Sequence, residues 1–273
     1  MGCFVKSKAI FTFSPNIICI YKITLGEIME RKVFTHIIAN IVLVVLVLAV
    51  ASIGFVGATT NVFKSNDNAP IYRGIGNNQV SLMVNVYWGT EYIDDMLAIF
   101  DKYKVTTTFF VGGTWVAQYP DVLQKIVSYG HEIGNHGYFH KEQSKLSYAD
   151  NVKEIVSCGK LVFEYAGKNM TLFAPPSGDF SSNTLAAARD NGYKTIMWSR
   201  DTIDWRDKDS NLVYSRATKD TSSGELILMH PTAHTRDALE KIIKYYLDNG
   251  FSIVPVSTNI GEIWTSTNNT QAD

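Results

Sequence analysis

Short stretches typical of β-strands alternate with amphipathic helical stretches from residue 79 to residue 265. The expected strands cover 80–86, 106–111, a short run ending near Asn135, 172–174, 194–197, 226–229 and 252–255. The expected helices cover 92–103, 120–129, 147–166, 183–191 and 236–249. Regular alternation predicts an α/β domain with a parallel sheet, and this many units favour a closed or nearly closed barrel over an open doubly wound sheet.

Two of the expected helices carry apolar stripes that predict their buried faces. In 147–166 the stripe consists of Val152, Ile155, Val156, Gly159, Val162 and Phe163. In 236–249 it consists of Leu239, Ile242, Ile243, Tyr246 and Leu247, and Asn249-Gly250 is a typical stop. Both helices are therefore expected to pack as an outer layer on the sheet.

The composition is that of an ordinary globular protein. The chain has 273 residues, of which 46% are hydrophobic and 19% charged, so one core is sufficient. Its net charge of −1 and the lack of a Lys/Arg cluster predict no nucleic-acid partner. Only Cys158 lies after the apolar run at residues 37–56, so the domain that follows this run cannot close an internal disulfide. We expect a monomer.

Residues 37–56 form an apolar run interrupted only by Asn40 and Ser52, which is long enough to cross a bilayer as a helix. Arg31 and Lys32 precede it, so the positive-inside rule leaves residues 1–35 in the cytoplasm and the domain outside the cell. We predict a single-pass anchor over 36–57. A signal peptide cleaved after 49–51 is the alternative, with the domain secreted.

Several boundaries follow from the local composition. Met29 begins a normal signal-anchor sequence and is a candidate true start. The polar stretch 58–78 is expected to be a linker, 79–265 the folded domain, and 266–273 a disordered tail.

Polar residues suited to chemistry follow the expected strands at their carboxyl ends. His136 and His140 stand four positions apart after the third strand, and two imidazoles so placed can bind one metal ion. A catalytic zinc site normally takes three protein ligands and leaves one position for water. The pair therefore predicts part of a metal site whose third ligand has to be found.

The region from Val80 to Trp264 resembles the NodB-homology domain of polysaccharide deacetylases, carbohydrate esterase family 4. The matching pieces are Gly134-Asn135-His136-Gly137-Tyr138-Phe139-His140, Phe173-Ala174-Pro175-Pro176-Ser177-Gly178, Asp201-Thr202-Ile203-Asp204-Trp205 and Leu228-Met229-His230. The resemblance implies a deformed (β/α) barrel and a divalent metal, usually zinc. It also implies hydrolysis of N-acetyl groups on a cell-wall glycan or a chitooligosaccharide-like substrate.

The resemblance assigns roles residue by residue. His136 and His140 are the implied metal ligands, His230 the general acid, and Asp204 the carboxylate that orients His230. The implied substrate-binding residues are Trp205, Trp88, Pro176 and Leu228.

The first and third family motifs are altered in this chain. The family reads Thr-Phe-Asp-Asp-Gly where this chain has Met83-Val84-Asn85-Val86-Tyr87, so the base is replaced by Asn85 and the metal-binding Asp by Val86. Asn85 cannot take up a proton at neutral pH, and Val86 has no lone pair for a cation. The Arg that pairs with the base is replaced by Ala174. The altered motifs resemble a branch of the family associated with spore-forming bacteria.

Two carboxylates could replace the missing groups, and each also has an ordinary structural interpretation. Glu91 is a candidate base or ligand, or a residue that favours a helix N-terminus. Asp179 is a second candidate, or a turn residue before the next helix. Asp201 is interpreted as a turn residue, His131 as structural and His234 as a surface loop residue.

Two functional hypotheses remain open. The first is a metal-dependent polysaccharide deacetylase in which Asn85 or Glu91 takes part in catalysis. The second is a catalytically impaired protein that keeps the groove and binds glycan or acts as a scaffold. A zincin-type protease fits poorly, because the stretch from His136 to His140 lacks the Glu that follows the first His in such enzymes.

Overall fold

The computed structural model describes residues 34, 36–38, 40–47 and 69–263, and the chain divides into two units, Met1–Ser65 and Asn66–Asp273. In the first unit, 36–38 and 40–47 are helical and have exposed side chains. Among the described residues no helix is both long and apolar enough to span a bilayer. The rest of the predicted anchor (36–57), Met29 and the tail (266–273) lie outside the described residues.

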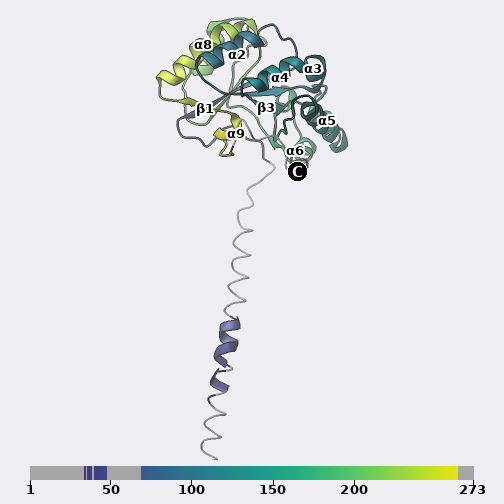
Figure 1. Cartoon of the computed structure of the whole chain (residues 1–273), viewed down its shortest axis with the longest axis vertical. Helices are drawn as coiled ribbons and strands as arrows, with labels where there is room; N and C mark the ends of the chain where they lie inside the picture. The colour runs from purple at the N-terminus through teal and green to yellow at the C-terminus, as the bar shows by residue number, and fades with distance from the viewer. Residues whose placement is uncertain (1–33, 35, 39, 48–68, 264–273) are drawn as a thin grey trace, which may run out of the picture. The chain divides into compact units, whose positions relative to one another are not determined.

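The second unit is built on a parallel sheet (Figure 1). Its strands are β1 (Gln79–Val86), β2 (Thr108–Val111), β3 (Glu132–Asn135), β4 (Leu172–Phe173), β5 (Lys194–Thr195), β6 (Arg200–Asp201), β7 (Glu225–Met229) and β8 (Ser252–Ile253). The order is β5-β4-β3-β2-β1-β7-β6, and β8 pairs with the start of β1. The predicted parallel α/β architecture is confirmed. Closure is only partial, because β5 and β6 end the path without pairing with each other in the described region.

Helices cover this sheet, and Figure 1 shows α2 beside α8 and α5 beside α6. The helices are α2 (Ile93–Lys102), α3 (Gly113–Gln118), α4 (Pro120–Ser128), α5 (Tyr148–Ala166), α6 (Ser182–Asp190), α7 (Ser210–Thr218), α8 (Ala233–Asp248) and α9 (Val256–Asn259). Two short 3₁₀ turns, η1 (Gln143–Lys145) and η2 (Pro176–Gly178), lie between them. The five predicted helices are confirmed. The prediction missed β6, α3, α7 and α9, which are short or weakly amphipathic.

The signals at the ends of α5 explain its bounds. The Ser147 hydroxyl caps the first turn by accepting a hydrogen bond from the Asp150 backbone N–H. Gly167 ends the helix in the left-handed conformation, with φ of 62°. The predicted stripe was partly wrong, because Phe163 is exposed and Cys158 is buried in its place. In α8, Leu247 is likewise exposed, whereas the other four predicted residues are buried.

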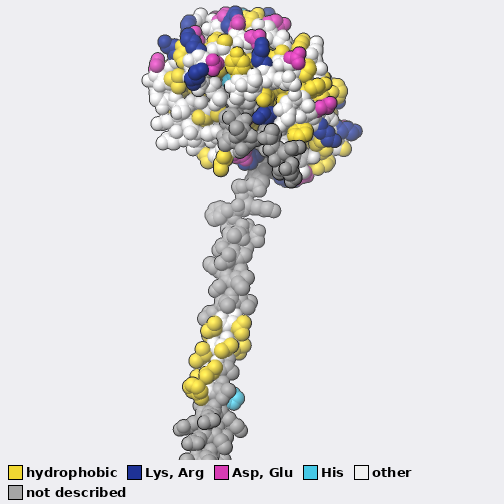
Figure 2. Space-filling view, in the orientation of Figure 1, with side chains coloured by type: hydrophobic (Ala, Val, Ile, Leu, Met, Phe, Trp, Pro, Cys, Tyr) yellow, Lys and Arg dark blue, Asp and Glu magenta, His cyan; other side chains and the backbone are white. Residues whose placement is uncertain are grey.

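Strand β1 is the centre of the core. Val80, Leu82, Val84 and Val86 belong to the larger apolar cluster, whereas Met83 packs in a second cluster that includes Phe110 and Leu226. Burial on both faces is expected for a strand inside a parallel sheet that helices cover. Over the helix-covered surface in Figure 2, Lys and Arg side chains are interspersed with Asp and Glu side chains.

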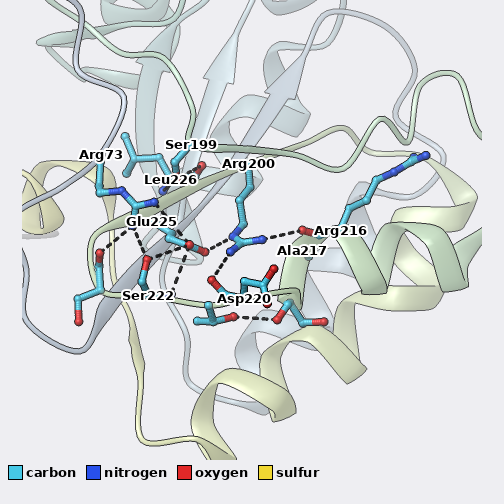
Figure 3. Close-up of polar contacts among 12 residues, drawn as sticks. Arg73, Ser199, Arg200, Arg216, Ala217, Asp220, Ser222, Glu225 and Leu226 are labelled. Atoms are coloured by element: carbon cyan, nitrogen blue, oxygen red, sulfur yellow. Dashed lines mark hydrogen bonds and ion pairs between the residues drawn. The ribbon is translucent and has the colours of Figure 1, made fainter.

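The predicted linker (58–78) ends too late, because its last residues belong to the folded unit. Ile71 donates its N–H to the Thr195 carbonyl at 2.9 Å, and its own carbonyl accepts from Met197 N at 2.8 Å. The Arg73 guanidinium lies 3.7 Å from the buried carboxylate of Glu225, within a network that Figure 3 shows. Polar composition alone could not reveal these backbone pairings, which join the segment to distant strands.

Candidate functional site

A cavity of about 440 Å³ opens at the carboxyl ends of the strands. It is lined by Asn85, Trp88, His136, His140, Ser177, Trp198, Asp201, Trp205, Leu228 and His230. These residues follow or end β1, β3, β4, β5, β6 and β7. Because parallel strands end at the same edge, residues far apart in sequence meet there, as they do in the active sites of parallel barrels.

His136 follows β3 and is almost fully buried. Its Nδ1 lies 2.7 Å from the Ala174 carbonyl oxygen, which can only accept, so Nδ1 carries the proton and Nε2 keeps its lone pair. Burial, reinforced by the nearby His140 ring, lowers the pKa of His136 to about 3. The imidazole is therefore neutral at physiological pH, which is the form that can act as a ligand or acceptor.

His140 lies across from His136, and their ring centroids are 5.1 Å apart. Its backbone has φ of 54°, a left-handed conformation that non-glycine residues adopt at a cost and that often occurs at functional sites. Burial lowers the pKa of His140, and the Tyr87 ring stacks on it at 4.4 Å. Tyr87, from the segment after β1, therefore covers one face of this imidazole.

Glu154 on α5 fixes the loop that carries His140. Its carboxylate is nearly fully buried and accepts backbone N–H groups from Tyr138 at 3.0 Å and Phe139 at 2.7 Å. Lys141 Nζ reaches the other carboxylate oxygen at 3.1 Å. Three charge-assisted contacts on one buried carboxylate hold the strained loop in one conformation. Glu154 was not predicted, because nothing in the helical pattern distinguishes it from a solvent-facing residue.

His230 follows β7 and is paired with Asp204. Nδ1 of His230 lies 2.7 Å from Asp204 Oδ1, and the other carboxylate oxygen accepts the His230 backbone N–H at 2.6 Å and the Thr235 hydroxyl. Asp204 is almost completely buried, so it fixes both the orientation and the tautomer of the ring. The Trp88 indole stacks on His230 with 5.4 Å between centroids and 20° between planes.

At the altered motif positions, no carboxylate faces the cavity. Asn85 is the next-to-last residue of β1, and its side-chain oxygen Oδ1 is buried without a hydrogen-bond partner among the described residues. Val86 is fully buried in the larger apolar cluster, and Ala174 is fully buried in the second one. Hydrophobic packing has therefore replaced the charged groups that the family motif predicts at positions 86 and 174.

The residues present fit the family's metal only in part. His136 and His140 offer two neutral imidazoles, but the third ligand position is Val86, whose side chain has no donor atom and packs in the core. Within the described part of the chain, no group of three or more His, Cys, Asp or Glu residues is placed to hold a metal ion. The family's three-ligand zinc site is thus incomplete here, although the family is typically metal-dependent.

Neither carboxylate suggested as a substitute lies in the cavity lining. Glu91 is exposed, and its carboxylate accepts the Thr90 backbone N–H at 2.9 Å. Asp179 accepts the Ser144 backbone N–H at 2.8 Å, which joins it to η1. Asp201 does line the cavity, and it also accepts the Ile203 N–H at 2.8 Å, which confirms the turn interpretation. Catalytic use of Glu91 stays a prediction that its position does not support.

The remaining predicted residues lie in mixed positions. Trp88, Trp205 and Leu228 line the cavity, whereas Pro176 is buried beside it and Ser177 takes its place in the lining. His131 is buried against the rings of Phe100 and Phe109, as a structural residue should be. His234 lies in the first turn of α8, so its assignment to a loop was wrong.

Trp198 is a cavity residue that sequence reasoning missed. It directly follows the expected strand 194–197, and its place at a carboxyl end was the signal that could have identified it. The indole packs so closely on Gly178 that a Cβ there would lie 2.5 Å from the Trp198 ring. Gly178 also has φ of 67°, so both the space and the backbone require glycine.

Fold and site together define a parallel α/β domain with a histidine-containing, indole-lined cavity at the carboxyl ends of its strands. A family model described as polysaccharide deacetylase matches residues 75–196. The peptidoglycan-N-acetylglucosamine deacetylase of Bacillus cereus is 31% identical over 172 residues, which is 61% of this chain and 80% of that protein. The chain belongs to the polysaccharide deacetylase family.

Relatives without an assigned activity are also similar. The uncharacterized protein YlxY of Bacillus subtilis is 36% identical over 194 residues, 71% of this chain and 61% of YlxY. This chain thus spans less than two thirds of that relative. A crystal structure of wild-type BA3943, described as a CE4 family pseudoenzyme from Bacillus anthracis, superimposes with a TM-score of 0.70 at 33% identity, covering 71% of this chain and 70% of that one.

Proposed function

We propose that this chain binds a cell-wall amino-sugar glycan in the cavity without efficient hydrolysis. The observation that carries the proposal is the replacement of both first-motif carboxylates. Asn85 stands in the lining where the family has its base, and Val86 packs in the core where the family has a metal ligand. Without a base or a complete metal site, water activation loses the groups that general-base and metal catalysis require.

The cavity lining supports sugar binding. Three indole rings, from Trp88, Trp198 and Trp205, line one cavity with Leu228, and Trp88 and Trp205 are about half exposed. Exposed aromatic rings offer large apolar faces together with an N–H donor, a combination suited to sugar rings that have one apolar face and a hydroxylated edge. An unused remnant of a catalytic site would gain nothing from exposing these rings to water.

The relatives support the same proposal. BA3943 is described as a pseudoenzyme, and a mutant of it, similar to this chain with a TM-score of 0.70 at 32% identity, is described as having restored enzymatic activity. The name of the Bacillus cereus relative specifies peptidoglycan N-acetylglucosamine. We therefore take the glycan strand of peptidoglycan as the ligand of this chain.

The experiment uses the purified full chain, tryptophan fluorescence and an acetate assay. Titration with chitotetraose should change the emission saturably, while acetate release stays at the level of a protein-free blank, with or without added Zn²⁺. Trp205→Ala should weaken binding, whereas Phe163→Ala, which alters an exposed ring on α5 outside the cavity, should not. Absence of saturable binding to both chitotetraose and purified sacculi contradicts the proposal.

A metal-dependent deacetylase that removes N-acetyl groups from the same glycan is the second candidate. It is favoured by the retained His230–Asp204 pair at 2.7 Å and by the neighbouring His136 and His140 imidazoles. Acetate release that a chelator abolishes and His136→Ala eliminates would establish this candidate. The double variant Asn85→Asp/Val86→Asp tests the origin of the loss: if the missing carboxylates are responsible, zinc-dependent acetate release should increase in this variant.

We also propose that the domain acts outside the cytoplasm, tethered by the segment 36–57. The support is the apolar run preceded by Arg31 and Lys32. Protease added to intact cells should digest the domain, whereas a cytoplasmic domain would be protected. A monomeric state and the lack of a nucleic-acid partner stay predictions of the sequence.

A further inference from the structure

Asn85 combines two features that together indicate a ligand. The residue is 3% exposed and lines the cavity, yet its buried side-chain amide oxygen, Oδ1, has no hydrogen-bond partner among the described residues. A buried acceptor without a partner is unfavourable, because it has lost its hydrogen bonds to water and has gained none in the protein. Such atoms are rare in folded proteins, and a bound donor is one common explanation.

The surroundings of Asn85 restrict what the donor can be. Leu228 and the indole of Trp198 line the same cavity, so a group that fits must present an N–H or O–H next to an apolar substituent. An acetamido group has this combination, since its N–H is adjacent to a methyl-bearing carbonyl. A free amine carries donors but no methyl group, and as an ammonium ion it must lose its hydration shell on entering the cavity.

Charges in the lining give an ammonium ion little compensation. Asp201 is the only carboxylate among the cavity-lining residues described, and one of its oxygens already accepts the Ile203 N–H. The Asp204 carboxylate is fully buried behind His230 and is occupied by His230 and Thr235. The lining is therefore better matched to a neutral donor than to a cation.

We propose that Asn85 makes glycan binding depend on N-acetylation. Its side-chain oxygen Oδ1 accepts the N–H of an intact acetamido group on the bound sugar. This inference rests on the proposed glycan-binding function and adds its specificity: the protein selects N-acetylated over de-N-acetylated amino sugars. At the position where family enzymes carry the base, this chain carries a neutral acceptor for the group that those enzymes remove.

The test compares chitotetraose with the fully de-N-acetylated tetramer of the same linkage and length, at pH 7, by calorimetry on the full chain. The wild type should bind the acetylated tetramer at least tenfold more tightly. Asn85→Leu, similar in size but without an acceptor, should reduce this ratio to threefold or less. Asn85→Asp keeps an acceptor oxygen and adds a negative charge, so the ratio should shift toward the deacetylated tetramer.

Asn211→Leu is the matched control, because Asn211 is exposed on α7 and does not line the cavity, and it should leave the ratio unchanged. If Asn85→Leu does not fold, as judged by circular dichroism, the shift in Asn85→Asp alone decides. Equal wild-type affinity for both tetramers overturns the inference but leaves glycan binding intact. A tenfold preference that persists in Asn85→Leu removes the role of Asn85. Binding of neither tetramer overturns the inference, and the proposed function falls with it if purified sacculi are not bound either.

Discussion

Buried polar groups differ in their hydrogen-bond partners between the two ends of the parallel strands. At the carboxyl ends, aromatic rings stack on two histidines, and the side-chain oxygen of Asn85 has no hydrogen-bond partner in the part of the chain that the structure describes. At the amino ends, β7 and β3 begin with the buried carboxylates of Glu225 and Glu132, and each of these makes several contacts. The amino ends therefore stabilise the fold, and the carboxyl ends are available to bind a ligand. Parallel barrels generally have this arrangement.

The Glu225 network shows how the amino ends are held together (Figure 3). Its carboxylate contacts the Arg200 guanidinium and accepts the Ser222 backbone N–H at 3.3 Å and hydroxyl at 3.2 Å. Arg200 in turn donates to the Asp220 carbonyl at 2.6 Å. The network joins β6, β7 and the segment that contains Arg73, all of which are distant in sequence.

Glu132 joins another set of elements. It accepts the Thr108 hydroxyl at 2.6 Å, the Ser257 backbone N–H at 3.3 Å and the Ser257 hydroxyl, so β2, β3 and α9 meet on one carboxylate. Burial raises the pKa of Glu132, and the hydrogen bonds partly offset this rise. Among the residues described, no comparable set of partners surrounds the Asn85 side-chain oxygen at the other end.

The largest expected effect comes from Glu225→Ala. Removing one partner leaves the Arg200 guanidinium without its buried counter-charge, so the free energy of unfolding should fall by roughly 3–5 kcal/mol. Urea denaturation followed by circular dichroism measures it. Glu240→Ala, which breaks a contact with Lys102 at an exposed site, should cost much less. If the two variants lose equal stability, the amino-end network is not the stabilising region that the comparison describes.

A second effect concerns pH, because His131 lies just before β3 at the amino end. Burial lowers the pKa of His131 from 6.5 to about 4 in the folded state. Between these values the unfolded chain binds a proton that the folded chain does not, so stability falls as the pH drops from 7 to 4 and this contribution levels off below 4. With about 1.4 kcal/mol for each pKa unit, the loss is on the order of 3 kcal/mol.

In the folded protein, His131 Nδ1 accepts the Thr107 N–H at 3.2 Å. The variant His131→Gln isolates the titration of His131, since the side-chain oxygen of the new Gln can still accept this N–H. Urea midpoints at pH 7 and pH 4 should differ less in this variant than in the wild type. His234→Gln, in the first turn of α8, is the control and should follow the wild type. Equal pH dependence in all three proteins would show that His131 titrates normally.

Sequence periodicity predicted the long elements because their apolar faces are repeated many times. The helix 147–166 was predicted within one residue by the spacing of its apolar residues. Strand β6 (Arg200–Asp201) is short and has no apolar residue, so the sequence has no strand pattern to detect there, and its pairing depends on β7. The same reason hid the role of Arg73, whose counter-charge Glu225 is more than a hundred residues away.

The candidate site was predictable to a different extent. His136, His140 and His230 follow strands and match family motifs, so their convergence could be expected from the sequence. The orientation of Val86 toward the core and the stacking of Tyr87 and Trp88 on two histidines could not, because they depend on the path of the chain after β1. Motif matching identified which groups were lost, and only the structure reveals what replaced them.

At the carboxyl end, Trp88→Ala should affect binding without affecting stability. Trp88 is 47% exposed and stacks on His230, so truncation removes a face for the sugar but little buried area. We expect about tenfold weaker binding of chitotetraose, equivalent to about 1.4 kcal/mol, with an unchanged urea midpoint. Phe163→Ala removes an equally exposed ring outside the cavity and should change neither quantity. A stability loss in Trp88→Ala as large as that of Glu225→Ala would break the comparison.

Glu154→Gln is expected to weaken binding less than Trp88→Ala, because Glu154 acts on the cavity only through the loop that carries His140. The amide oxygen of Gln can still accept the N–H groups of Tyr138 and Phe139, but the charge that strengthens these bonds and attracts Lys141 is lost. The loop should then hold His140 less firmly, and chitotetraose binding should weaken about threefold, or roughly 0.7 kcal/mol.

Lys141→Met separates the two contributions of Glu154, since it removes only the half-exposed ion-pair partner and leaves both backbone contacts. Its effect on binding should be smaller than that of Glu154→Gln.

Proton NMR of the His140 ring should show a shift in Glu154→Gln if the loop moves. An unshifted ring with unchanged affinity would mean that the strained His140 backbone holds itself in place. Preorganisation at the carboxyl end would then reside in the loop and not in α5.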